Sequence, residues 1–194
     1  MRSVTFDDLE PTGSEQYTRY TFTEALETSN LAANRYHVPP GGTLPGGLHA
    51  HMDQEEIFVI LEGTAVFDTL EGSARVSAEG AIRFAPGEFH SGRNDTNEPL
   101  EMVALGAPKE TEDVRVPATC PACVEPRLRL EGGGGDVYFS CPNADCGRRY
   151  RALACPHCAH ETLSFVAIEG TPVVRCQECA SDFEQPPLEH IGKE

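Results

Sequence analysis

The sequence predicts an all-β protein in which one β-barrel is followed by two small cysteine-rich modules. Over residues 1–107, short apolar segments alternate with clusters of turn-forming residues. Many short strands at near-regular spacing are typical of a sandwich or barrel. Beyond residue 117 the composition changes, and all eight cysteines of the chain fall in that part at a repeated spacing.

The barrel segments are rich in β-branched and aromatic residues and are four to eight residues long. We expect strands at 16–23, 34–38, 57–61, 64–69, 74–77, 81–84 and 100–105. Residues that favour turns separate them, at 39–42, 62–63, 71–72, 86–87 and 94–99. Only residues 22–33 are compatible with a helix, and only for one or two turns.

The segment GLHAHMDQEEIFVILEG, residues 47–63, carries three candidate metal ligands. His49 and His51 lie two residues apart, so on a strand both side chains leave the same face. Glu56 opens an apolar run that Gly63 closes. Imidazoles and a carboxylate inside a sheet are costly unless a partner such as a metal compensates them.

A fourth candidate, His90, follows the turn at 86–87 in GAIRFAPGEFHSGRN, with Asn94 four residues later. Together the two segments resemble the two signature motifs of the cupin superfamily. The stretch from His49 to Gly63 has the family spacing, whereas Gly42 stands one residue too far from His49. In the second motif Gly87, His90 and Asn94 match, while Pro86 and Gly80 are each displaced by one residue.

The resemblance implies a cupin double-stranded β-barrel (jelly roll) that holds one metal through His49, His51, Glu56 and His90. Four protein ligands on a six-coordinate ion leave up to two adjacent positions for water, dioxygen or a substrate. Such a ligand set suits Fe, Mn, Ni or Zn, so we expect one divalent transition metal. The alternative is a barrel with an empty site or with solvent-facing histidines.

The eight cysteines form an internal repeat after a linker at residues 108–117. Moving by 35 residues carries the pair Cys120 and Cys123 to Cys155 and Cys158, and Cys141 to Cys176. The last cysteines, Cys146 and Cys179, differ in spacing from the one before them. We expect modules at 118–152 and 153–187, and a tail at 188–194.

Each module resembles a zinc ribbon, in which two knuckles place four thiolates tetrahedrally around a structural Zn. We therefore expect two Zn ions, the first held by Cys120, Cys123, Cys141 and Cys146, the second by Cys155, Cys158, Cys176 and Cys179. About 35 residues bury too little surface to fold without such a site. Disulfides or a redox pair are the alternatives, and another pairing would join the two inner cysteine pairs.

The chain is strongly acidic, with net charge −16 from 31 acidic and 15 basic residues, and only Lys109 and Lys193 are lysines. Such a surface remains soluble in high salt, which suggests a salt-loving source as a hypothesis. Phosphate affinity requires cationic surface, and residues 117–187 carry more acidic than basic groups. We therefore expect no nucleic-acid partner, although the arginine cluster at 148–151 is a local exception.

Two functions compete for the barrel site. In the first, the protein is a mononuclear metalloenzyme, either a non-haem dioxygenase-like oxidoreductase or an isomerase that uses the metal as a Lewis acid. In the second, it is a non-catalytic small-molecule-binding or regulatory module whose ribbons dock a protein partner. A purely structural barrel metal is a third option. No catalytic residue beyond the ligands, and no particular substrate, can be named.

No long apolar segment and no hydrophobic signal region occur in the sequence. We expect a soluble cytoplasmic protein without membrane contact. Cupin barrels commonly pair through edge strands, so the resemblance also suggests a homodimer.

Overall fold

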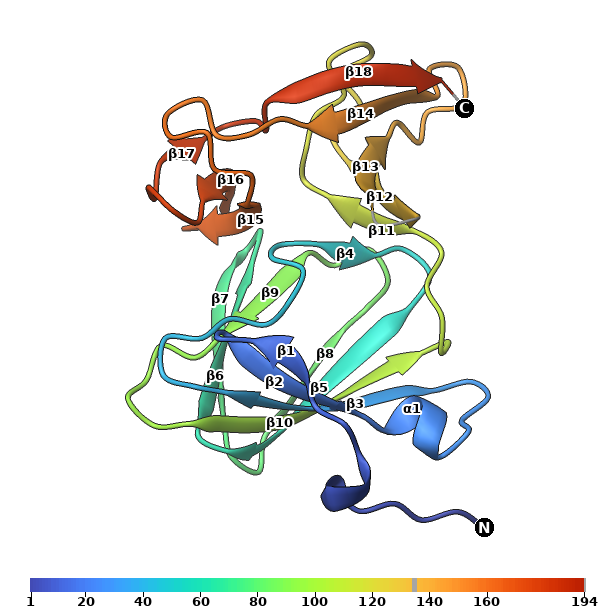
Figure 1. Ribbon diagram of the computed structural model, residues 1–194, viewed down its shortest axis with the longest axis vertical. Coiled ribbons are helices and arrows are strands. Elements are labelled where there is room, and N and C mark those ends of the chain that lie inside the picture. Colours follow the sequence, from blue (N-terminus) through green and yellow to red (C-terminus); the bar gives the residue numbers. More distant parts are fainter. Residues whose placement is uncertain (134–135, 194) are drawn as a thin grey trace.

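The computed structural model describes residues 1–133 and 136–193. A barrel with the N-terminus at its far end occupies one half, and the cysteine modules cover the other end (Figure 1). The strands are β1 (Thr12–Ser14), β2 (Tyr17–Thr21), β3 (Ala32–Val38), β4 (Ala50–His51), β5 (Glu55–Glu62), β6 (Thr64–Thr69), β7 (Gly72–Ser77), β8 (Ala81–Phe84), β9 (His90–Arg93), β10 (Leu100–Ala107), β11 (Val114–Val116), β12 (Leu128–Gly133), β13 (Asp136–Ser140), β14 (Arg148–Ala152), β15 (Leu163–Ile168), β16 (Thr171–Cys176), β17 (Asp182–Phe183) and β18 (Leu188–Lys193).

Two antiparallel sheets face each other in the barrel. The larger has the order β1-β2-β3-β10-β5-β8, and the smaller has the order β7-β6-β9. Their inner faces share one apolar core that includes Phe58, Ile60, Phe67 and Met102. The all-β prediction is confirmed.

Burial on the central strands follows the period of two that the pleat imposes. Along β10 every second residue is buried, beginning with Leu100. The turn from β5 to β6 depends on Gly63, whose φ is +79°. A Cβ at Gly63 would lie 2.5 Å from the carbonyl oxygen of Pro99, so only glycine fits this close approach.

The seven strands expected in the barrel are all present, with boundaries shifted by at most two residues. The helix-compatible interval holds a single turn, α1 (Phe22–Ala25), and a 3₁₀ turn, η1 (Phe6–Asp8), precedes it. The short strands β1, β4, β9 and β11 were not expected. Within the described residues, no helix is long and apolar enough to cross a membrane.

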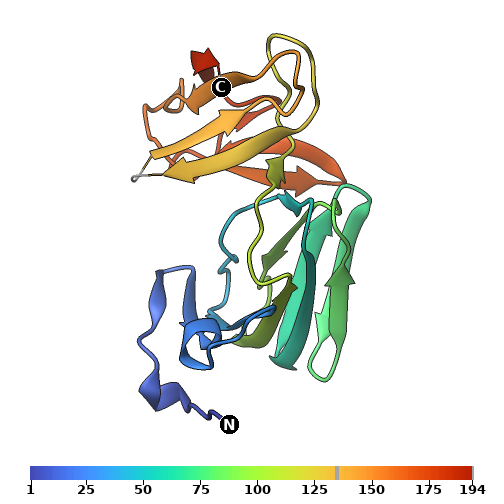
Figure 2. The same cartoon turned by 90° about the vertical axis from the view of Figure 1, so that its right-hand side faces the viewer.

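The cysteine modules form two further sheets. One has the order β18-β14-β13-β12-β11-β4, and the other has the order β15-β16-β17. The expected linker, 108–117, therefore contains β11, which joins β4 of the barrel half to β12 of the first module. The expected tail, 188–194, contains β18, which pairs with β14, while residue 194 lies outside the described part. After a quarter turn, the modules again lie at one end of the barrel (Figure 2).

Candidate metal centres

Three separate segments bring the four predicted barrel ligands together. His51 lies on β4, Glu56 lies near the start of β5, and His90 is the first residue of β9. His49 precedes β4 and forms a backbone bridge with His90 in which each N–H donates to the other carbonyl, at 3.1 and 2.9 Å. The bridge places the two imidazoles side by side, with ring centroids 5.0 Å apart.

The candidate ligand atoms of His49, His51 and Glu56 all lie within 4.8 Å of one another, and His90 approaches this group at Glu56. The Nε2 atoms of His49 and His51 lie 3.1 Å apart, and Oε2 of Glu56 lies 3.3 Å from His51 Nε2 and 2.9 Å from His90 Nε2. Ligands bound about 2.1 Å from a metal at right angles lie about 3.0 Å from one another. The observed separations therefore fit neighbouring ligands of one ion.

Backbone carbonyls fix which nitrogen of two rings faces the cavity. Nδ1 of His49 donates to the carbonyl oxygen of Gly47 at 2.8 Å, and Nδ1 of His90 donates to that of Glu88 at 3.1 Å. In neutral His49 the lone pair then lies on Nε2, as a metal ligand requires. In His90, Nε2 is the nitrogen that faces Oε2 of Glu56. Within the described part of the chain, the buried Nδ1 of His51 has no hydrogen-bond partner.

The electrostatics of the group favour the forms that bind metals. Burial, with the nearby His90, lowers the pKa of His49 to about 4, and burial also lowers the pKa of His51. Burial opposes ionisation of Glu56, but the hydrogen bond with His90 and the charges of the histidines lower its pKa overall. Near neutral pH the neutral imidazoles of His49 and His51 thus face the carboxylate of Glu56, an arrangement that suits a cation.

Aromatic packing holds His90 in place. Phe84 stacks on its ring with centroids 4.1 Å apart and planes within 10°, and Phe58 meets it edge-on at 5.9 Å. Its side chain is only 4% exposed. The carbonyl of Glu88 and the rings of Phe84 and Phe58 therefore hold the His90 ring in one orientation.

A cavity of about 270 Å³ opens beside the four ligands. Its wall includes polar groups that the sequence did not single out, among them Tyr36, Gln54, Lys109 and Thr111. Gln54 is buried and donates from Nε2 to the carbonyl oxygen of Pro108 at 2.6 Å, which holds the chain just before Lys109 against the barrel. The only sequence signal for Lys109 was that lysine is rare in this chain.

Asn94, the last residue of the second motif, does not reach the metal group. Its side chain is 1% exposed and donates to the carbonyl oxygens of Val38, at 3.0 Å, and Glu98, at 2.8 Å. Its Oδ1 accepts from the backbone and the hydroxyl of Thr96. Asn94 therefore joins the end of β9 to β3.

The eight cysteines gather in two groups of four, Cys120, Cys123, Cys141 and Cys146, and Cys155, Cys158, Cys176 and Cys179. These are the two groupings that the repeat predicted, and the alternative pairing of the inner cysteines does not occur. All eight thiols are free. The closest sulfur pairs lie 3.4 and 3.8 Å apart in the first group and 3.6 and 3.7 Å apart in the second, far beyond disulfide length.

Four thiolates bound tetrahedrally at about 2.3 Å lie about 3.8 Å from one another. The two cysteine groups approach this spacing. Burial opposes ionisation of Cys120, but hydrogen bonds from the Tyr150 hydroxyl and from backbone N–H groups lower its pKa to about 6. Hydrogen bonds involving Ser181 lower the pKa of Cys179 to about 6. Each group thus holds one thiol that ionises readily.

Comparison with known proteins identifies the barrel fold. Residues 34–106 match the family model described as a cupin domain. A sugar phosphate isomerase from a cupin superfamily, from Silicibacter pomeroyi, superposes with a TM-score of 0.51 at 16% identity, covering 74% of this chain and 88% of that one. A putative sugar phosphate isomerase from Acidithiobacillus ferrooxidans gives 0.52 at 15% identity, covering 71% and 90%. The polyketide cyclase RemF from Streptomyces resistomycificus gives 0.52 at 20%, covering 64% and 91%. No curated protein matches the chain.

Proposed function

With the barrel a cupin domain, we propose that this chain is a metal-dependent protein whose barrel binds a small anionic molecule beside one divalent transition metal. The observation that carries the proposal is the convergence of His49 and His51 with the carboxylate of Glu56, which His90 Nε2 in turn approaches to 2.9 Å. The carbonyls of Gly47 and Glu88 orient two of these rings for metal binding.

The cavity composition indicates the kind of ligand. Lys109 is the only lysine or arginine among the described residues that line it, and no ion pair of Lys109 occurs among those residues. Tyr36 also lines the cavity, and burial raises its pKa, so its hydroxyl remains protonated near neutral pH. A small acid with a metal-chelating oxygen at one end and a carboxylate or phosphate at the other would suit both groups.

A bound divalent metal would supply Lewis-acid chemistry by polarising a ligand oxygen. The residues of the chain then have separate tasks in this proposal. Lys109 attracts and orients the anion, Tyr36 donates a hydrogen bond to a ligand oxygen, and Phe58 excludes water from the apolar wall beside His90. Isomerisation is the reaction class that this arrangement suits best, because polarisation of a ligand oxygen acidifies the adjacent C–H bond and no external oxidant is needed; the reaction would further require an acid–base group to move the proton.

Ligand binding tests the proposal directly. Cobalt-loaded protein is titrated calorimetrically with small dicarboxylates, hydroxy acids and sugar phosphates. Binding of at least one anion that weakens by about tenfold or more in Lys109→Gln is the expected result, since a charge-assisted contact contributes about 1.5–3 kcal/mol. Lys193→Gln is the matched control, because Lys193 is the other lysine and lies on β18. Equal affinity of both variants for every anion would contradict the proposed role of Lys109.

We also propose that the cysteine groups hold two structural zinc ions in zinc-ribbon modules. The sulfur separations of 3.4 to 3.8 Å and the lowered pKa of Cys120 support this assignment. Elemental analysis should give two zinc ions per chain that remain after mild chelation and disappear when thiols are alkylated under denaturing conditions. Protein that keeps its fold with no zinc would count against the assignment.

We do not propose nucleic-acid binding for this protein. Two of the three arginines at 148–151 make contacts within the protein: Arg149 lies over the ring of Tyr138 at 4.0 Å, and Arg151 pairs with Glu189. With the net charge of −16, little cationic surface is left for phosphates. DNA binding that persists at moderate salt would contradict this.

A further inference from the structure

We infer that the two cysteine modules position the ligands of the barrel metal, so that the affinity of the barrel for its metal depends on the modules being folded. The inference rests on the proposed function, because it assumes metal in the barrel and zinc in the modules. It assigns the modules a role inside this chain that differs from docking a partner. Three independent contacts carry it, and all of them meet the segment that bears His49 and His51.

The first contact is a strand pairing. Strand β4 pairs with β11, with Val114 opposite His51 and Arg115 opposite Ala50, and the N–H of Met52 donates to the carbonyl of Asp113 at 2.8 Å. Strand β11 continues into β12 of the first module. Among the described strands β4 has no other partner, so the strand that carries His51 is an edge of the module sheet rather than of either barrel sheet.

The second contact comes from the other module. The N–H of Leu48 donates to the carbonyl of Phe165, on β15, at 2.7 Å. The approach is so close that a Cβ on Gly47 would lie 2.7 Å from the same carbonyl oxygen. The residue before His49 is thus hydrogen-bonded to the second module, and the carbonyl of Gly47 in turn orients the His49 ring.

The third contact is a shared core. Leu48 and Ala50 are fully buried, and they belong to one apolar cluster with module residues that include Cys120, Phe139 and Phe165. Alternation along the segment therefore sends residues 48 and 50 into the module core and residues 49 and 51 into the metal group. Phe89, next to His90, belongs to the same cluster.

The two faces of this segment have different neighbours, the module core on one side and the metal group on the other. This is the physical reason why module folding and metal affinity are coupled. The apolar side of the ligand segment is packed by modules that are too small to retain their fold without metal. If a module unfolds, Leu48 and Ala50 lose their packing and the ligand segment gains conformational freedom. Groups that orient metal ligands typically contribute about 10–100-fold to metal affinity.

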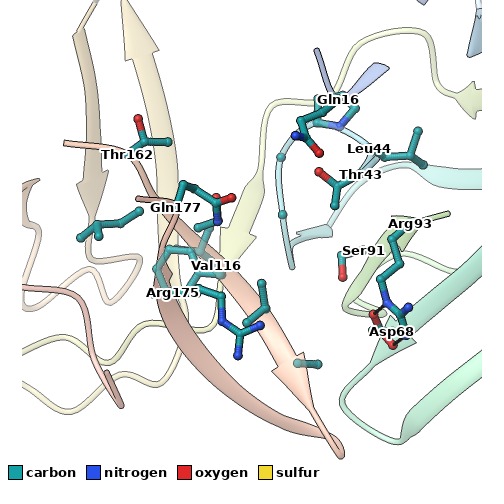
Figure 3. Close-up of a pocket in the computed structure, with 18 of the residues that line it drawn as sticks. Gln16, Thr43, Leu44, Asp68, Ser91, Arg93, Val116, Thr162, Arg175 and Gln177 are labelled. Carbon is teal, nitrogen blue, oxygen red and sulfur yellow. Dashed lines mark hydrogen bonds and ion pairs between the residues drawn. The ribbon is translucent and has the colours of Figure 1, made fainter. Parts of the chain in front are cut away.

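The second module touches the barrel locally rather than along a broad face. A crevice of about 1710 Å³ lies between the barrel and the two modules, bounded by Gln16, Thr43 and Leu44 on the barrel side, by Thr162, Arg175 and Gln177 of the second module, and also by Val116 of β11 (Figure 3). Beyond Phe165, the tip of the β15–β16 hairpin meets the barrel at Gly170, where a Cβ would lie 2.8 Å from the carbonyl oxygen of Leu70. A small change at this tip can therefore move β15 without touching a metal ligand.

The test measures cobalt binding to the barrel of zinc-replete protein by d–d absorption, without reference to activity. Cys158→Ser removes one thiol of the second module. Gly170→Ala places a methyl group too close to the carbonyl oxygen of Leu70 and so displaces the hairpin tip. Gly41→Ala is the matched control: its φ of +77° equals the +80° of Gly170 within a few degrees, but its Cβ would meet nothing within 4 Å. Both alanines therefore carry the same backbone strain.

We expect the cobalt affinity of the barrel to fall about tenfold or more in Cys158→Ser, to fall by a smaller factor in Gly170→Ala, and to remain within about twofold of wild type in Gly41→Ala. Hydrogen exchange of the Leu48 amide gives a second readout that needs no barrel metal, and it should accelerate in Cys158→Ser. Wild-type affinity in both test variants, with Leu48 still protected, would overturn the inference. Absence of cobalt binding in wild type would instead overturn the proposed function.

Discussion

Replacing Asn94 with alanine should destabilise the barrel while leaving its metal ligands untouched. The side chain is fully buried and makes four hydrogen bonds, two as donor and two as acceptor. The partners at Thr96 and Glu98 lie near the surface, where water can replace the amide. The carbonyl of Val38 lies in a residue that is 0% exposed, so it would remain unpaired.

The magnitude follows from these partners. Each replaceable hydrogen bond contributes about 1 kcal/mol, and a buried acceptor left unpaired costs about 1–3 kcal/mol. We expect a loss of about 2–4 kcal/mol, which for an m-value near 2 kcal/mol/M lowers the urea midpoint by roughly 1–2 M. Circular dichroism during urea unfolding measures this midpoint. The control is Asn97→Ala at an exposed position, whose unfolding free energy should stay within about 0.5 kcal/mol of wild type. A midpoint shift no larger than that of the control would refute the structural role of Asn94.

Three further outcomes follow from particular residues. Arg115, followed by Arg129, lowers the pKa of Asp113 against an opposing effect of burial. A lowered pKa adds stability above the unfolded value near 4. The difference in unfolding free energy between wild type and Asp113→Asn should therefore be constant at neutral pH and shrink progressively as the pH falls below about 4. A difference that stayed the same from pH 7 down to pH 2 would contradict this assignment. Gly63→Ala should lower the melting temperature by several degrees because its Cβ has no room beside Pro99, whereas Gly72→Ala, also at positive φ but with open space, should lower it less. The net charge of −16 predicts that the melting temperature rises between dilute buffer and molar salt, and a flat or falling curve would remove the salt-loving hypothesis.

Much of the barrel could be predicted because the sequence features that identify its strands and turns lie within a few residues of one another. Alternating burial and turn residues identified seven strands, and the spacing from His49 to Glu56 identified ligands that the fold does bring together. His90 could be added only through the family pattern, since nothing near it in sequence requires contact with Glu56. The cysteine grouping was predictable because the repeat distinguishes between the possible pairings.

The connections between barrel and modules could not be predicted, because strand pairing over long sequence separations leaves no local trace. Strand β4 is two residues long, and its pairing with β11 depends on where the whole first module lies. Polar residues and prolines dominate residues 108–117, and this composition predicts a linker. Lys109 lies in that segment, and its place on the cavity wall follows from the bond between Gln54 and Pro108.

A count of metal ions per chain tests the central claim most directly, using wild type beside His51→Ala. If the barrel and both cysteine modules hold metal, wild type should contain about three ions per chain, two of them zinc, and the variant about two, both zinc. The missing ion would then be the one held by His49, Glu56 and His90 with His51. Equal metal content in the two proteins would contradict the assignment of this site, and with it the account of how the barrel functions.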